Sequence, residues 1–229
     1  MGMEIRVQKF LSEAGLASRR RAEEFIKSKQ VTINGKIAVL GSKVDPEKDV
    51  VKVYGKLVTA SPEKLYVALY KPKGYVVSKR DPQHRKTVFE LLPEEMRSKV
   101  WNVGRLDFDT EGLLILTNDG DLTQQLAHPS FEHDKEYEIT TDQTPKDAQL
   151  EKLRQGVEIA TGVTYPAKLK ARGNRIYLII HEGKKRQVRR MFSAVGLPVL
   201  NLKRVRVNKL TLPNIAPGEY KLVKKNDIL

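Results

Sequence analysis

Five carboxylates and one arginine lie close together in residues 104–121, GRLDFDTEGLLILTNDGD, and could do chemistry. Asp107 and Asp109 have the D-x-D spacing with which magnesium-dependent phosphotransferases hold a cation and supply a nucleophile. Against this, Arg105 would compete with the metal, and residues 102–106 form a poor buried strand. The motif leaves a magnesium-dependent phosphohydrolase open as one interpretation.

A second interpretation of the same stretch is purely structural. Asp109 and Glu111 could cap turns, and Arg105 could form a surface ion pair with Asp107, which would contribute little stability. Residues 118–121, Asn-Asp-Gly-Asp, predict a turn after the apolar run that ends at residue 117, because Asp-Gly is a common turn dipeptide.

Other sites that would bind a metal have little support. The chain has no cysteine, which excludes disulfides, thiolate zinc sites and cysteine nucleophiles. His128 and His133 could suggest a metal pair, but their spacing fits no zinc motif. We therefore expect no metal and no cofactor.

The charge of the chain points to a polyanionic partner. Lys and Arg number 42 against 28 Asp and Glu, a net charge of +14, which suits counterion release from nucleic acid. A merely basic soluble protein and an anionic membrane are the alternatives. The cations gather in three clusters, at 19–21, 184–190 and 203–209, and this segregation favours RNA or DNA.

Neither a membrane-spanning apolar run nor a charged-then-apolar leader is found in the sequence. The absence of cysteine suits a reducing compartment. We therefore expect a cytoplasmic protein without membrane association.

The first sixty residues predict two short helices. Apolar residues at 7, 10, 11 and 14 follow helical spacing, and Gly15 can end that helix. Ser18 is a natural N-cap for a second helix, which places Arg19, Arg20 and Arg21 in its first turn. Because a helix N-terminus attracts anions and disfavours cations, a phosphate partner would resolve the conflict.

A hairpin and a linker follow these helices. The segments 31–33 and 37–39 alternate in polarity around Asn34-Gly35, a strong hairpin signal. The small, polar residues 59–62 predict a linker. We therefore expect one domain in residues 1–60 and a second in residues 64–229.

The second part reads as strands with occasional helices. Strands are predicted at 65–70, 75–78, 100–103, 113–117, 135–140, 167–171 and 176–180, with a helical turn at 88–92 and a helix at 187–195 that Gly196 and Pro198 end. This mixture predicts an α+β fold, with a mostly antiparallel mixed sheet and flanking helices.

Residues 5–55 resemble the alpha-L RNA-binding domain first described in a small-subunit ribosomal protein. The helix–helix–hairpin order matches, and so do the segments Ser-Arg-Arg at 18–20 and Val-Thr-Ile-Asn-Gly-Lys at 31–36. This resemblance implies an RNA-binding module. We expect its contacts to come from Arg19, Arg20, Arg21 and Lys36.

The acidic stretch itself resembles the catalytic motif of the RsuA/RluB family of ribosomal RNA pseudouridine synthases. The match is Gly-Arg-Leu-Asp at 104–107 followed by Asp-Thr-Glu-Gly-Leu-Leu at 109–114. Three more segments resemble the family's other motifs in the right order: Lys-Pro-Lys-Gly at 71–74, Lys-Glu-Tyr at 135–137 and Glu-Gly-Lys-Lys-Arg-Gln-Val-Arg-Arg-Met at 182–191. The family also carries the alpha-L domain, so the resemblance covers nearly the whole chain.

The resemblance implies a role for each of four residues. Asp107 would be the nucleophile or anionic stabiliser at the bond between sugar and base, and Arg189 would keep that carboxylate charged despite burial. Tyr137 would stack on the flipped uracil, and its hydroxyl could take part in proton transfer. Arg105 would reach into the RNA near the vacated base position.

Simpler interpretations of these residues stay open. Tyr137 taken alone is a tyrosine at the edge of a core, and the basic run 184–190 taken alone is a non-specific phosphate patch. From that run we expect RNA contacts by four residues: Lys184, Lys185, Arg186 and Arg190.

The sequence therefore predicts an RNA isomerase that needs no cofactor and converts a uridine of ribosomal RNA to pseudouridine. The Lys-Lys-Arg-Gln form of residues 184–187 resembles large-subunit members of the family more than small-subunit ones, which implies large-subunit RNA as the substrate. The expected partner is ribosomal RNA or a ribosomal particle, and nothing requires more than a monomer. A non-enzymatic ribosome assembly factor that binds rRNA is the alternative from another class.

Overall fold

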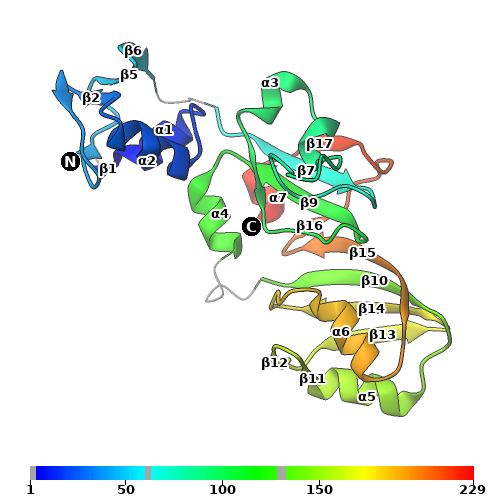
Figure 1. Ribbon diagram of the computed structural model, residues 1–229. Helices are drawn as coiled ribbons and strands as arrows, with labels where there is room; N and C mark the ends of the chain where they lie inside the picture. The colour runs from blue at the N-terminus through cyan, green and yellow to red at the C-terminus, as the bar shows by residue number, and fades with distance from the viewer. Residues whose placement is uncertain (1–3, 60–62, 128–132) are drawn as a thin grey trace. The chain divides into compact units, whose positions relative to one another are not determined.

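The computed structural model describes residues 4–59, 63–127 and 133–229 (Figure 1). The chain divides into two compact units. One comprises Met1–Leu65 with Glu94–Trp101 and Thr117–Gly120, and the other comprises Tyr66–Pro93, Asn102–Leu116 and Asp121–Leu229. Most of the predicted linker 59–62, and His128, lie outside the described residues. No described helix is long and apolar enough to cross a membrane.

The N-terminal part of the chain forms the predicted helices and hairpin. Its elements are β1 (Ile5–Arg6), α1 (Val7–Glu13), α2 (Arg19–Lys27), β2 (Val31–Ile33), β3 (Lys36–Ile37), β4 (Lys43–Val44), β5 (Val51–Val53) and β6 (Lys56–Val58). The strands pair in the order β3-β2-β5-β6, and β1 pairs with β4. One apolar core joins the helices to these strands, so this segment has a core of its own.

Local signals explain these boundaries. The Ser18 hydroxyl accepts a hydrogen bond from the Arg21 amide at 3.2 Å, which caps α2 as predicted. Asn34 and Gly35 both have positive φ, at 50° and 82°, as a tight two-residue hairpin turn requires.

The rest of the chain is built on a nine-stranded sheet within the described residues. Its elements are β7 (Tyr66–Lys71), the 3-10 helix η1 (Val88–Leu91), α3 (Glu94–Arg97), β8 (Trp101–Val103), β9 (Glu111–Thr117), α4 (Gly120–Ala127), β10 (Lys135–Thr141), α5 (Asp147–Gln155), β11 (Glu158–Ile159), β12 (Gly162–Val163), β13 (Lys168–Arg172), β14 (Arg175–Ile180), α6 (Gln187–Ala194), β15 (Val199–Val207), β16 (Leu210–Thr211), β17 (Tyr220–Leu222) and α7 (Lys225–Ile228). The strand order is β13-β14-β10-β15-β9-β7-β17, with β16 beside β15 and β8 beside β9.

The sheet confirms the α+β expectation. The pairs β10–β14, β10–β15, β13–β14, β15–β16 and β7–β17 are antiparallel. β15 runs parallel to β9, and that contact is short: Lys203 faces Glu111 and Arg204 faces Gly112. β9 and β15 therefore join the two halves of the sheet over only two residue pairs (Figure 1).

Two predictions of local structure were wrong. Residues 75–78 form no strand, and Val76 makes only an isolated bridge with Thr87, because β7 is already flanked by β9 and β17. Asn118–Asp121 does not form a simple turn, because Gly120 begins α4. The helix α5 and the long strand β15 were not predicted.

The two faces of the sheet differ in burial. Tyr137 and Ile139 of β10 are buried and face Arg204 and Leu202 of β15, both also buried. Residues opposed in antiparallel strands share a face, and successive residues alternate. Lys203 therefore lies on the opposite, less buried face. α5 packs on β13 and α6 on β15, so we place both helices on the buried face.

Candidate active site

A tight turn carries Asp107 into β9. The Thr110 amide donates to the Asp107 carbonyl at 3.1 Å, which closes the turn. Two later carbonyls, those of Asp109 and Thr110, accept hydrogen bonds from side chains: Arg189 Nη2 of α6 donates to the Asp109 carbonyl at 2.8 Å. Lys71 Nζ, at the end of β7, donates to the Thr110 carbonyl at 2.7 Å. Two cations from distant parts of the chain thus fix this turn.

Asp109 is the carboxylate that the arginines bind. Arg186 donates to both of its oxygens, Nη1 to Oδ1 and Nη2 to Oδ2, each at 2.9 Å. Arg189 Nε lies 3.2 Å from Asp109 Oδ2. Hydrogen bonding from Arg186, helped by the charges of both arginines, holds the pKa of Asp109 below its usual value. The same bonds raise the pKa of Arg186.

This arrangement corrects the expected pairing of Arg189 with Asp107. No ion pair to the Asp107 side chain occurs among the described residues, and the expected surface pair with Arg105 is absent there too. The reason is the turn, in which α6 approaches from the Asp109 side. Asp107 is half-buried and Arg105 is exposed, so both have side-chain atoms that can meet a substrate.

Lys71 is a site residue that the sequence analysis quoted without a role. Its side chain is fully buried, and burial lowers the pKa of Lys71 to about 8, opposed by the negative charges of Asp109, Asp107 and Glu111. Asp107 therefore lies within the field of a buried ammonium as well as that of Arg186. The sequence feature that could have indicated a role for Lys71 is its place at the end of the otherwise apolar strand β7.

Tyr137 of β10 is linked to β9 by way of β15, the strand between them. It is 8% exposed and faces Arg204, whose Nε donates to the Leu113 carbonyl at 2.8 Å. Arg204 in turn faces Gly112 of β9. Since adjacent strands lie about 4.8 Å apart, the Tyr137 and Gly112 backbones are about 10 Å apart. Gly112 is the fifth residue after Asp107 in the sequence, so Tyr137 and the Asp107 turn lie at neighbouring parts of the sheet.

Gly112 makes this close join of strands possible. Its φ is +108°, and a β-carbon there would lie 2.2 Å from the Arg204 carbonyl oxygen. Side chains other than hydrogen are therefore excluded at this position. The sequence shows the glycine but not the strand that requires it.

The predicted phosphate-binding residues fall into two groups. Arg19, Arg20, Lys36 and Lys185 are exposed, and Arg190 is half-buried; none has a side-chain partner within the described part of the chain. The others are already bound within the protein. Arg21 pairs with Glu24 and lies over the Phe25 ring, Lys184 donates to the Val163 carbonyl and pairs with Glu182, and Arg186 binds Asp109.

The third basic cluster, at 203–209, is largely internal. Arg204 is buried, and Arg206 Nε binds Glu136 Oε2 at 2.8 Å. Lys203 Nζ lies 5.0 Å from the centre of the Tyr70 ring. Arg204 and Arg206 of this cluster are therefore already bound within the protein.

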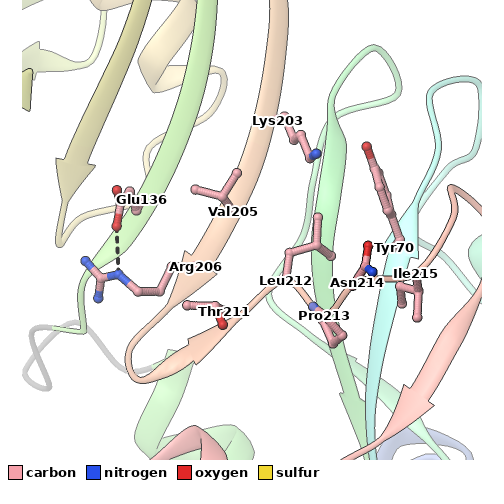
Figure 2. A pocket seen from close by; sticks show the side chains of 10 residues that line it. All are labelled: Tyr70, Glu136, Lys203, Val205, Arg206, Thr211, Leu212, Pro213, Asn214 and Ile215. Atoms are coloured by element: carbon pink, nitrogen blue, oxygen red, sulfur yellow. Dashed lines mark hydrogen bonds and ion pairs between the residues drawn. The ribbon is translucent and has the colours of Figure 1, made fainter. Parts of the chain in front are cut away.

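A pocket of about 460 Å³ lies on the opposite face of the sheet from Tyr137 (Figure 2). Tyr70 and Lys203 line one side and the Glu136–Arg206 pair another, with the loop from Leu212 to Ile215 closing it. Tyr70 donates to Glu111 at 3.1 Å. Asp107, Tyr137 and Arg189 do not line this pocket, so it is separate from the candidate site.

The donor set argues against the magnesium interpretation of Asp107 and Asp109. Arg186 occupies both Asp109 oxygens, which a cation would need. Within the described residues no group of three or more His, Asp or Glu side chains has metal-binding geometry. Among the described residues the arrangement instead leaves the Asp107 carboxylate without an ion pair, in a turn whose carbonyls accept hydrogen bonds from two cations.

Comparisons with known proteins show the family of this chain. The family model described as RNA pseudouridylate synthase matches residues 65–194, and the S4 domain model matches residues 5–51. The chain is 39% identical over 231 residues to ribosomal large subunit pseudouridine synthase B of Bacillus subtilis, covering 97% of this chain and 93% of the relative. It is 38% identical to an uncharacterized RNA pseudouridine synthase of Aquifex aeolicus, covering 99% and 93%.

A solved structure extends the similarity to the fold. A crystal structure of a pseudouridylate synthase matches with a TM-score of 0.72 and 30% identity, covering 98% of each chain.

Proposed function

We propose a substrate and a set of reacting residues for this chain, which belongs to the RNA pseudouridylate synthase family and isomerises uridine in RNA to pseudouridine. The substrate proposed is a uridine of large-subunit ribosomal RNA, because a relative covered to 93% of its length is named ribosomal large subunit pseudouridine synthase B. The observation that carries the site assignment is the turn at Asp107, which Lys71 and Arg189 hold by two successive carbonyls.

The reaction breaks the bond from C1′ to N1, turns the uracil, and forms the bond from C1′ to C5. The proton of C5 leaves and N1 gains one, so the product has the same composition as the substrate. Asp107 would supply the negative charge next to C1′, either by bonding to that carbon or by assisting loss of the base. Lys71 and Arg186 both interact electrostatically with Asp107, so positive charge lies near this carboxyl group.

The other assignments follow from position. The target base must leave its stack, at a cost of a few kcal/mol. Tyr137, on the face shared with Arg204, would stack on the flipped uracil. Exposed Arg105 would reach into the RNA where the base had been. Arg189 would act on Asp107 through the turn rather than by a direct ion pair.

We further propose that residues 1–60 bind RNA and residues 64–229 carry the reaction. The S4 and pseudouridylate synthase models match within these ranges. The unpartnered cations Arg19, Arg20, Lys36, Lys185 and Arg190 would bind phosphates, with Lys184, Arg186 and Arg21 joining them if the RNA displaces their present partners. The protein would act as a monomer in the cytoplasm, away from membranes.

The test uses fragments of large-subunit rRNA that carry tritium at C5 of uridine, because that label is released when C5 bonds to C1′. Wild type should release tritium from one fragment, and Asp107→Asn should lower the rate about 10³-fold or more while RNA affinity stays nearly unchanged. Glu151→Gln is the control, since it removes a carboxylate that pairs with an exposed arginine of α5.

Two results would contradict the proposal. Full activity of Asp107→Asn would remove that residue from the chemistry. Tight rRNA binding with no release from any rRNA would favour an assembly factor. Activity in EDTA would exclude a magnesium-dependent reaction.

A further inference from the structure

We propose that Asp109 is a positioning residue, which aligns Asp107 by locking α6 and Arg189 onto the turn. This inference rests on the function proposed for Asp107. It differs from a direct pairing of Arg189 with the reacting carboxylate, because in the described residues Arg189 contacts this turn through the Asp109 carbonyl and the Asp109 carboxylate.

Asp109 holds α6 at two points. It binds Arg186, the residue just before α6, and Arg189 in the first turn of that helix. These residues are three apart and so lie on one side of the helix start. Arg189 also donates to the Val199 carbonyl at 3.2 Å, which ties the same guanidinium to β15. One carboxylate therefore connects β9, α6 and β15.

The backbone of Arg186 supports this locking role. Its φ of 53° and ψ of 31° are left-handed, a conformation that is unfavourable for a residue with a β-carbon. Such conformations persist where surrounding contacts enforce them. Here the contact is the two-bond fork onto Asp109, which suits arginine and not lysine.

The two aspartates of the turn thus have separate roles. Both Asp109 oxygens accept hydrogen bonds from Arg186, and the negative charge is balanced by two guanidinium groups. A carboxylate held in this way is a poor nucleophile. Asp107 has no such partner in the described parts of the chain, and its place depends on the turn. Loss of Asp109 should therefore move Asp107 without removing it.

Single-turnover kinetics with enzyme in excess over tritiated rRNA would test this role. We expect Asp109→Asn to lower the rate of the bound complex about 10²-fold, as small misplacements of a reacting group do, with RNA affinity unchanged. Asp109→Glu, which keeps the charge, should restore part of the rate. A saturating single-turnover rate does not depend on the folded fraction, so mere destabilisation would leave it unchanged. Glu151→Gln is the matched control, expected at the wild-type rate.

A second measurement needs no RNA. Urea unfolding of Asp109→Asn, Arg186→Gln and the double variant forms a thermodynamic cycle. We expect the double variant to lower the urea midpoint by less than the sum of the two single variants. The reason is that each single change already breaks the hydrogen bonds between Arg186 and Asp109. Additive losses would overturn the lock.

Each kinetic result is decisive. If Asp109→Asn is as inactive as Asp107→Asn and glutamate restores nothing, Asp109 reacts and the inference is wrong. If Asp109→Asn turns over at the wild-type rate, Asp109 positions nothing. If wild type modifies no rRNA, the proposed function fails, while the unfolding cycle still tests the lock.

Discussion

Two cations of α2, Arg19 and Arg20, differ in their surroundings from the cations around the Asp107 turn. Arg19 and Arg20 are exposed at the start of α2, with no side-chain partner in the described residues. Lys71, Arg189 and Arg204 are buried or nearly so, and each donates to a main-chain carbonyl. The first group can bind phosphate without rearrangement. The second group fixes the protein's own backbone.

The net charge of +14 does not show how many cations are available to bind RNA, because it counts exposed and internally bonded cations alike. A cation that already donates to a carbonyl or carboxylate must lose that bond before it can bind RNA. We therefore expect the two regions to respond differently to mutation, in stability around the turn and in RNA affinity at α2.

Glycine substitutions should separate the regions most strongly. Gly112→Ala places a β-carbon against the Arg204 carbonyl, so we expect a loss of about 4 kcal/mol or more in unfolding free energy. Gly35→Ala in the first hairpin meets no atom within 4 Å and should cost only about 1 kcal/mol. Urea unfolding measures both. Equal losses of unfolding free energy in the two variants would show that Gly112 of β9 and Arg204 of β15 are not closely packed.

Lys71 should give stability a pH dependence. Burial lowers its pKa to about 8 in the folded state, so between pH 8 and the usual value near 10.5 the unfolded chain binds more protons. The unfolding free energy of wild type relative to Lys71→Met should therefore rise with pH across this window, by about 1–3 kcal/mol. Below pH 8 the difference should be constant. Parallel curves throughout would mean that Lys71 titrates normally.

Arg19→Gln with Arg20→Gln should affect binding and leave the fold intact. We expect RNA affinity to fall about 10-fold at 0.15 M salt, and the slope of log affinity against log salt to become shallower by about 1.4. The unfolding free energy should change by less than about 0.5 kcal/mol. An unchanged salt slope would remove these arginines from the RNA contact.

Thr110→Val should have the smallest effect. The Thr110 hydroxyl is buried and has no hydrogen-bond partner in the described residues. Removing a polar group that makes no bond is nearly neutral or stabilising. A drop in the unfolding midpoint would indicate a hydrogen bond to a buried water.

The sequence was sufficient for features set by short-range interactions. The cap at Ser18, the turn at Asn34-Gly35 and the existence of strands such as β9, β10 and β14 follow from spacing and residue type, because these signals come from residues within a few positions of each other. Gly120 shows the limit. As a dipeptide, Asp-Gly predicts a turn, yet here it begins α4, because the following residues are packed as a helix.

The partners of charged groups were decided by the tertiary structure. Arg186 and Asp109 are 77 residues apart, and Arg204 and Leu113 are 91 apart. Asp107 and Asp109 look equivalent from spacing alone, and so do the arginines of the three clusters. A guanidinium binds whichever oxygen the fold brings within reach, and only the packing of α6 and β15 against the turn places Asp109 and the Leu113 carbonyl there.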